Sequence, residues 1–148
     1  MLKKYPVLDE RGNKVQDNSN KNKRIRMLLA DSSTFTRIVL ANALEQLGFD
    51  VVAVAKDDRE ALGKWAECRP DIALIDLNLK GMGGIDVIRV LVADNPSAIV
   101  VLLMPENIDD PEIIVQAVRA GARSFIKKPT SGEEMGTRLS KLLRAKGE

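Results

Sequence analysis

Residues 70–78 read PDIALIDLN, and within them an uninterrupted apolar run, 72–75, ends at Asp76. Other short apolar runs recur along the chain, at 27–30, 51–55, 99–104 and 124–126. They are mostly aliphatic or β-branched and continuous rather than alternating. Runs of this kind are typical of strands buried on both faces of a parallel sheet. The sequence therefore predicts five buried, parallel strands.

Helical patterns fill the gaps between these runs. They cover about 33–47, 58–68, 85–93 and 111–120, and a last one begins at Ser131. In the first helix we expect an inward face made of Phe35, Ile38, Val39, Leu40, Leu44 and Leu47. In the second, Trp65 has the spacing of a core residue.

Strands that alternate with helices predict an α/β protein, in which helices cover both faces of a doubly wound parallel sheet. The alternation starts near residue 25, so we expect one domain over 25–148. Residues 1–24 lack hydrophobic periodicity and mix Asn with Lys, which predicts a flexible basic leader. In sheets of this class, functional groups gather at the carboxyl ends of the strands.

Composition narrows the chemistry. The 148 residues contain no histidine and one cysteine, which excludes His-dependent nucleophiles, His-bearing zinc sites and internal disulfides. Residues 1–26 carry eight Lys or Arg and three Asp or Glu, a net of +5, whereas 27–148 carry fifteen and eighteen, a net of −3. The basic excess therefore lies in the leader and indicates little about nucleic acid. The chain has neither a signal-peptide stretch nor a membrane-length apolar run, which favours a cytoplasmic protein.

Four of the apolar runs end in segments that bring in polar residues: Asp31-Ser32, Asp76-Leu77-Asn78, Met104-Pro105-Glu106 and Lys127-Lys128. Because these strand ends meet at one edge of a parallel sheet, we expect Asp31, Asp76 and Lys128 to converge. Carboxylates with backbone carbonyls suit Mg²⁺, and a lysine can hold a phosphoryl oxygen. Taken singly, Asp31 could be a helix N-cap, Asp76 a turn residue and Lys128 a solvated strand end. Their recurrence together favours a site in which an aspartate attacks phosphorus.

The chain from about Arg26 to Leu143 resembles the receiver domain of bacterial response regulators, in particular the single-domain chemotaxis regulators. The resemblance rests on a strand leading to an aspartate, a second such strand, a glycine-rich loop, and two later motifs. In this sequence these pieces read MLLAD (27–31), PDIALID (70–76), GMGGID (81–86), AGA (120–122) and FIKKP (125–129). The resemblance implies a flavodoxin-like fold with strand order 2-1-3-4-5.

The resemblance also implies roles for individual residues. Asp76 matches the phosphoacceptor and Lys128 the lysine that contacts the phosphoryl group. Asp31, Asp76 and the backbone carbonyl of Asn78 match the ligands of Mg²⁺. Phe125 matches an aromatic switch residue that changes rotamer with the activation state.

Three positions depart from the family pattern. Ser32 stands at the second position of an acidic pair, and the loss of a carboxylate there should weaken Mg²⁺ binding. Sliding the alignment to place Ala30 and Asp31 on the pair would need an insertion, and one carboxylate would still be missing. Met104 stands at the switch position usually held by Ser or Thr, and its thioether cannot donate a hydrogen bond. Lys80 replaces a usual proline.

We therefore expect a receiver of a two-component phosphorelay, with Mg²⁺ as cofactor. A histidine kinase or histidine phosphotransfer protein would phosphorylate Asp76. An unknown downstream protein would bind the fourth helix, fifth strand and fifth helix. We expect no turnover enzyme, no DNA-binding domain and no membrane association. The main alternative is an atypical receiver that acts as a protein-interaction module without phosphorylation. A flavodoxin-like cofactor domain is disfavoured, because the chain has one Trp, one Tyr and no recognisable phosphate loop.

Overall fold

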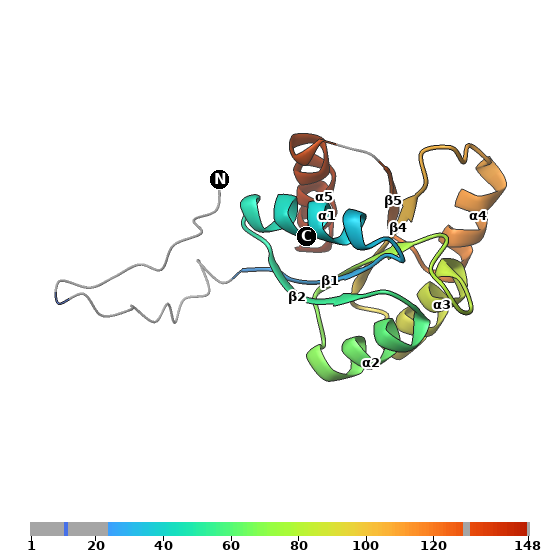
Figure 1. The fold of residues 1–148 in the computed structure, drawn as a ribbon, viewed down its shortest axis with the longest axis horizontal. Helices are drawn as coiled ribbons and strands as arrows, with labels where there is room; N and C mark the ends of the chain where they lie inside the picture. Colours follow the sequence, from blue (N-terminus) through green and yellow to red (C-terminus); the bar gives the residue numbers. More distant parts are fainter. Residues whose placement is uncertain (1–10, 12–23, 129–130, 148) are drawn as a thin grey trace.

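The computed structural model describes residues 11, 24–128 and 131–147 (Figure 1). The leader predicted over 1–24 lies outside these residues, apart from Arg11 and Arg24. None of the helices in the described part is long and apolar enough to cross a membrane. Strands and helices alternate in the order β1 (Arg26–Ala30), α1 (Thr34–Gln46), β2 (Asp50–Ala55), α2 (Asp58–Cys68), β3 (Ile72–Asp76), α3 (Gly84–Asp94), β4 (Ile99–Met104), α4 (Pro111–Ala120), β5 (Ser124–Lys127) and α5 (Gly132–Gly147).

The strands form one parallel sheet in the order β2-β1-β3-β4-β5, which confirms the predicted topology. The observed strands differ from the predicted ones by no more than one residue at either end. Ala30 pairs with Ile75, and Met104 pairs with Lys127. The residues that follow β1, β3, β4 and β5 therefore share one edge of the sheet.

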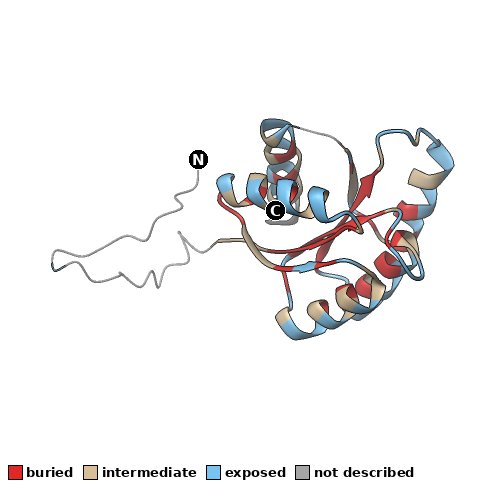
Figure 2. Cartoon of the chain, in the orientation of Figure 1, coloured by how far each residue is buried: buried red, intermediate tan, exposed pale blue. Residues whose placement is uncertain are grey.

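Helices α1 and α5 cover one face of the sheet, and α2, α3 and α4 cover the other (Figures 1 and 2). Successive residues of each strand point to opposite faces, so each strand contributes to two apolar clusters. All of β3 is buried, as expected for a strand covered on both sides. Trp65 is a core residue as predicted, and its indole N–H donates to Asp94 at 2.8 Å, which joins α2 to α3.

The predicted inward face of α1 was wrong in its first two turns. Phe35, Ile38 and Val39 are exposed, by 76%, 64% and 47%. Leu40 and Leu44, four residues apart, are the buried residues of this helix. One turn before Leu40 the same face carries Thr36 and Arg37, because residues three and four apart share a helix face. The apolar residues of the first turns therefore face solvent.

Arg24 fixes the chain at the opposite edge of the sheet from the strand ends described above. Its Nε donates to the carbonyl of Gly48 at 3.0 Å, and its Nη2 donates to the carbonyl of Phe49 and to Glu45 Oε1. Glu45 Oε2 accepts in turn from the backbone N–H of Val51 at 2.7 Å. This network ties the start of β1 to the turn between α1 and β2.

Candidate functional site

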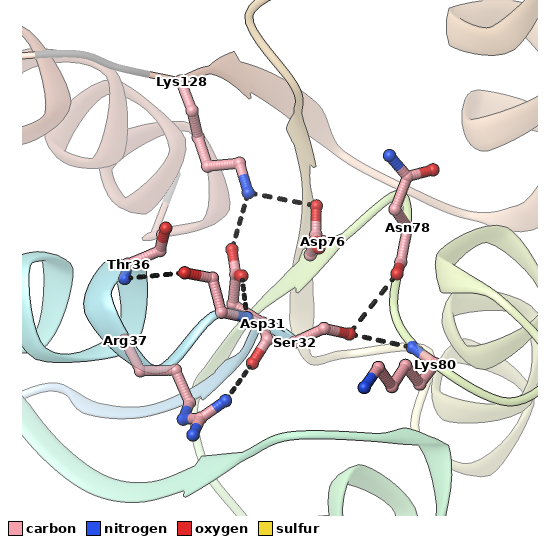
Figure 3. A network of polar contacts seen from close by, with 9 residues as sticks. Asp31, Ser32, Thr36, Arg37, Asp76, Asn78, Lys80 and Lys128 are labelled. Carbon is pink, nitrogen blue, oxygen red and sulfur yellow. Dashed lines mark hydrogen bonds and ion pairs between the residues drawn. The ribbon is translucent and has the colours of Figure 1, made fainter.

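Asp31, Asp76 and Lys128 meet at the carboxyl edge of the sheet, as the sequence predicted (Figure 3). Lys128 Nζ lies 2.6 Å from Asp31 Oδ2 and 3.1 Å from Asp76 Oδ1. The backbone N–H of Lys128 donates to the carbonyl of Met104 at 2.8 Å, which continues the pairing of β4 with β5 beyond the last strand residue. The sheet register thus brings together groups separated by up to 97 residues of chain.

The carboxylate of Asp31 is buried, and each of its oxygens has a partner in the structure. Its second oxygen, Oδ1, accepts from the backbone N–H of Ser33 at 2.9 Å. The N-cap of α1 is Ser33, whose side chain accepts from Thr36 N, so Asp31 does not cap the helix. Arg37 donates to the backbone carbonyl of Asp31 at 2.6 Å. Asp31 is therefore held in place as a partner of Lys128.

Asp76 is a buried acid whose side chain is 6% exposed. Burial raises the pKa of Asp76 above its ordinary value, and the negative charge of Asp31 raises this pKa further. Lys128 and the backbone N–H of Asn78 lower the same pKa without cancelling the rise. The two carboxylates thus form a like-charge pair whose negative charge the ammonium group of Lys128 partly neutralises.

Ser32 points away from Lys128 and contacts the loop after β3 (Figure 3). We call residues 77–83 the acceptor loop. The Ser32 hydroxyl donates to the carbonyl of Asn78 at 3.4 Å and accepts from the backbone N–H of Lys80 at 3.0 Å. Asp31 faces the lysine and Ser32 faces the Asn78 carbonyl, which agrees with the alignment that needs no insertion.

The oxygens at this edge suit Mg²⁺ in kind, but they carry little charge. The described residues contain no group of three or more His, Cys, Asp or Glu that could hold a metal ion. The available oxygens come from the side chains of Asp31, Asp76 and Ser32 and from the carbonyl of Asn78. The charges of Asp31, Asp76 and Lys128 sum to −1. Burial first and the charge of Asp31 second raise the pKa of Asp76, and a bound cation would offset the repulsion between the two carboxylates. These hard oxygens fit Mg²⁺, with Ser32 supplying a neutral oxygen where a carboxylate would supply charge.

Met104 and Phe125 occupy the two predicted switch positions beside this site. Met104 is 2% exposed and packs in the apolar cluster under α3 and α4. Its thioether offers no hydroxyl group to Asp76. Phe125 is half-buried, and the guanidinium of Arg138 lies 5.2 Å from the centre of its ring. Arg138 also donates to the carbonyl of Phe125 at 2.7 Å. The sequence analysis missed Arg138, because nothing in its local pattern separates it from a solvated helix residue.

Comparisons with known proteins agree with this geometry. The family model described as "Response regulator receiver domain" matches residues 27–140. Chemotaxis protein CheY of Thermotoga maritima is 30% identical over 117 residues, which cover 79% of this chain and 96% of that protein. The DNA-binding response regulator MtrA of Mycobacterium leprae is 39% identical over 121 residues, covering 82% of this chain and 52% of that protein.

Solved structures show the same fold. The response regulator domain of Thermotoga maritima CheB aligns with a TM-score of 0.70 at 28% identity, covering 83% of this chain and 96% of that one. A CheY-like receiver domain protein from Methanospirillum hungatei aligns with a TM-score of 0.77 at 22% identity, covering 84% and 98%. The family match spans most of the chain, and the two relatives match it at 30% and 39% identity. The chain therefore belongs to the response regulator receiver domain family of two-component systems.

Proposed function

We propose that this receiver accepts a phosphoryl group on Asp76 from a phosphohistidine of a histidine kinase or histidine phosphotransfer protein. The observation that carries the proposal is the contact of Lys128 with both carboxylates at the edge of the sheet. A lysine ammonium group can hold a phosphoryl oxygen there as a point charge. Asp76 keeps a small exposed fraction, which gives a donor access to it.

The transfer forms a bond between phosphorus and an oxygen of Asp76 as the bond between phosphorus and the donor imidazole breaks. The electron pair of the broken bond returns to the imidazole, which takes a proton from solvent. Lys128 neutralises charge on the phosphoryl oxygens, and Asp31 holds Lys128 in place. Mg²⁺, held by Asp76, the carbonyl of Asn78 and surrounding oxygens, would supply further positive charge to the phosphoryl group.

The exposed apolar residues of α1 support a docking surface for the donor. Phe35, Ile38 and Val39 lie in the first two turns of a helix that starts three residues after Asp31. Apolar side chains clustered on a surface are typical of protein contact sites. A donor bound to this surface would lie beside the carboxyl edge of the sheet, where Asp76 is. Output would pass to a downstream protein on α4, β5 and α5, where Val115 and Val118 are also exposed. We place these contacts in the cytoplasm and expect no reaction with turnover.

Incubation with acetyl phosphate and Mg²⁺ tests the proposal. We expect a covalent adduct that hydroxylamine removes, seen by intact-protein mass spectrometry. Asp76→Asn should abolish the adduct, whereas the matched change Asp86→Asn on the exposed first turn of α3 should leave it intact. An adduct that persists in Asp76→Asn would assign the acceptor elsewhere.

A second function, partner binding without phosphorylation, is favoured by the position of Met104. The residue is buried in an apolar cluster and offers no hydrogen-bond donor to a phosphoryl oxygen. Under this alternative acetyl phosphate yields no adduct, and Asp76→Asn leaves partner binding unchanged.

A further inference from the structure

The acceptor loop is held from the side of α2 as well as by Ser32. The backbone N–H of Asp58 donates to the carbonyl of Lys80 at 3.0 Å. Oδ2 of Asp58 accepts from the backbone N–H of Met82 at 3.1 Å. Lys80 and Asp57 also form an isolated parallel β-bridge. The start of α2 therefore binds the acceptor loop at Lys80 and Met82, on either side of Gly81.

Gly81 and the carboxylate of Asp58 fit each other. Gly81 has a φ of +101°, which L side chains rarely adopt. A Cβ at this position would lie 2.2 Å from the carboxyl carbon of Asp58. The space that a side chain at residue 81 would fill is thus occupied by the carboxylate.

Asp58 is not the N-cap of α2, and only one of its carboxylate oxygens bonds to the helix. The N-cap of α2 is Asp57, whose side chain accepts from the backbone N–H of Glu60 at 2.9 Å. Asp58 uses Oδ1 on the backbone N–H of Arg59 and leaves Oδ2 for Met82. Its charge at the N-terminus of α2 favours the helix in any orientation of the side chain. The orientation observed serves the loop.

Asn78 lies at the start of the segment that these contacts hold, two residues before Lys80. Ser32 binds both the carbonyl of Asn78 and the backbone N–H of Lys80 (Figure 3). On the other side, the backbone N–H of Asp58 donates to the carbonyl of Lys80, and the side chain of Asp58 holds Met82. Both backbone polar groups of Lys80 are therefore engaged, one from each side. This arrangement limits where the carbonyl of Asn78 can point.

We propose that Asp58, paired with Gly81, is a positioning residue that sets the place of the Asn78 carbonyl relative to Asp76. The inference rests on the proposed function, in which that carbonyl is a ligand of Mg²⁺. Magnesium requires near-octahedral geometry with bonds of about 2.0–2.1 Å, so a displaced carbonyl weakens binding. The effect should be large here because Ser32 stands where a carboxylate would add negative charge to that of Asp31 and Asp76.

The test compares Asp58→Ala, Asp58→Asn and the control Asp86→Ala in the full chain. Metal affinity is read from the electron paramagnetic resonance signal of free Mn²⁺, and loop order from hydrogen exchange at the amides of Lys80 and Met82. Asp58→Ala should weaken Mn²⁺ binding about tenfold, the usual size for loss of a residue that orients a metal ligand, and should speed exchange at Met82. Asp58→Asn keeps an oxygen that accepts from Met82 and should rescue both readouts. Asp86→Ala should change neither.

The Mg²⁺ dependence of labelling by acetyl phosphate separates positioning from general stability. Asp58→Ala should raise the Mg²⁺ concentration for half-maximal labelling and leave the rate at saturating Mg²⁺ nearly unchanged. A variant that lost only stability would melt at a lower temperature with wild-type Mg²⁺ dependence. If Asp58→Ala does not fold, Asp58→Glu, which moves the carboxylate by one methylene, provides the same comparison and should also weaken Mn²⁺ binding.

Each outcome decides the inference. Wild-type Mn²⁺ affinity in Asp58→Ala, or unchanged exchange at Met82, would overturn it. Weakened Mn²⁺ binding in a protein that acetyl phosphate never labels would uphold the positioning role and reject the proposed function. A wild-type chain that binds no Mn²⁺ would reject both.

Discussion

The ammonium group of Lys128 lies 2.6 Å from a carboxylate oxygen of Asp31, whose side chain is 2% exposed. The pair joins the end of β1 to the end of β5 across the middle of the sheet. Asp76 belongs to β3, between those two strands, and shares the same ammonium group. The stability of the carboxyl edge of the sheet and the chemistry proposed there therefore both depend on the ammonium group of Lys128.

Replacing Lys128 by Met should destabilise the protein. The change leaves two buried carboxylates without their cation, and breaking a buried ion pair from one side costs about 3 kcal/mol. Urea unfolding at neutral pH measures the loss. The double variant Lys128→Met with Asp31→Asn should recover part of it, because one of the two repelling charges is gone. A double variant no more stable than Lys128→Met would contradict this account.

Asp76→Asn should stabilise the metal-free protein, and the gain should depend on pH. Burial and Asp31 raise the pKa of Asp76 in the folded state above the ordinary value of 3.8. The folded protein therefore binds this proton more tightly than the unfolded chain does, and ionised Asp76 lowers the free energy of unfolding. The gain from Asn is complete above the folded-state pKa and disappears as pH falls through that pKa toward 3.8. Thermal unfolding in EDTA across this range measures it. A gain independent of pH would show that the charge of Asp76 is not its cause.

Met104→Thr tests the buried switch position. The substitution brings a hydroxyl into an apolar cluster and should cost about 1–3 kcal/mol of stability unless the hydroxyl finds a partner. Met104→Leu, which conserves volume, serves as the control and should cost less than about 1.5 kcal/mol. Urea unfolding of the three proteins provides the comparison. A Met104→Thr protein as stable as the wild type would mean that the hydroxyl finds a partner at the site.

Changing Phe35 and Ile38 together to Ser should separate donor docking from chemistry. Both side chains are mostly exposed, so each change should alter stability by less than about 0.5 kcal/mol. Labelling by acetyl phosphate should be unaffected, because a small donor needs no docking surface. Transfer from a phosphorylated histidine phosphotransfer protein should slow. Val90→Ser, at an exposed apolar residue of α3, is the control, and equal slowing there would exclude a specific role for α1.

The layout of the sheet was predictable because its strands are buried on both faces. Such strands leave continuous apolar runs in the sequence. The buried run of 72–75 is therefore enough by itself to locate β3, without information from the other strands. The strand order did not follow from the runs and came from the family resemblance. The meeting of Asp31, Asp76 and Lys128 followed from the rule that parallel strands place their carboxyl ends together.

Side-chain direction was harder to predict. Apolar residues at helical spacing in α1 indicated a buried face, yet Phe35 and Ile38 are on the solvent side, because Leu40 and Leu44 fix the rotation of the helix. The contact of Asp58 with Met82 joins segments 24 residues apart that have no shared periodicity. A glycine at residue 81 was visible in the sequence, but the carboxylate that needs its space was not.

The hydrogen bonds of Arg24 have a practical consequence for immobilising this protein. They hold the chain at the edge of the sheet where β1 starts, and β1 then runs five residues, about 17 Å at the usual rise per residue, toward Asp31. A surface tether or a fluorescent label attached before Arg24 would join the domain at the edge of the sheet opposite to Asp76. Binding assays built on such a tether would present the acceptor edge and the first turns of α1 to the solution.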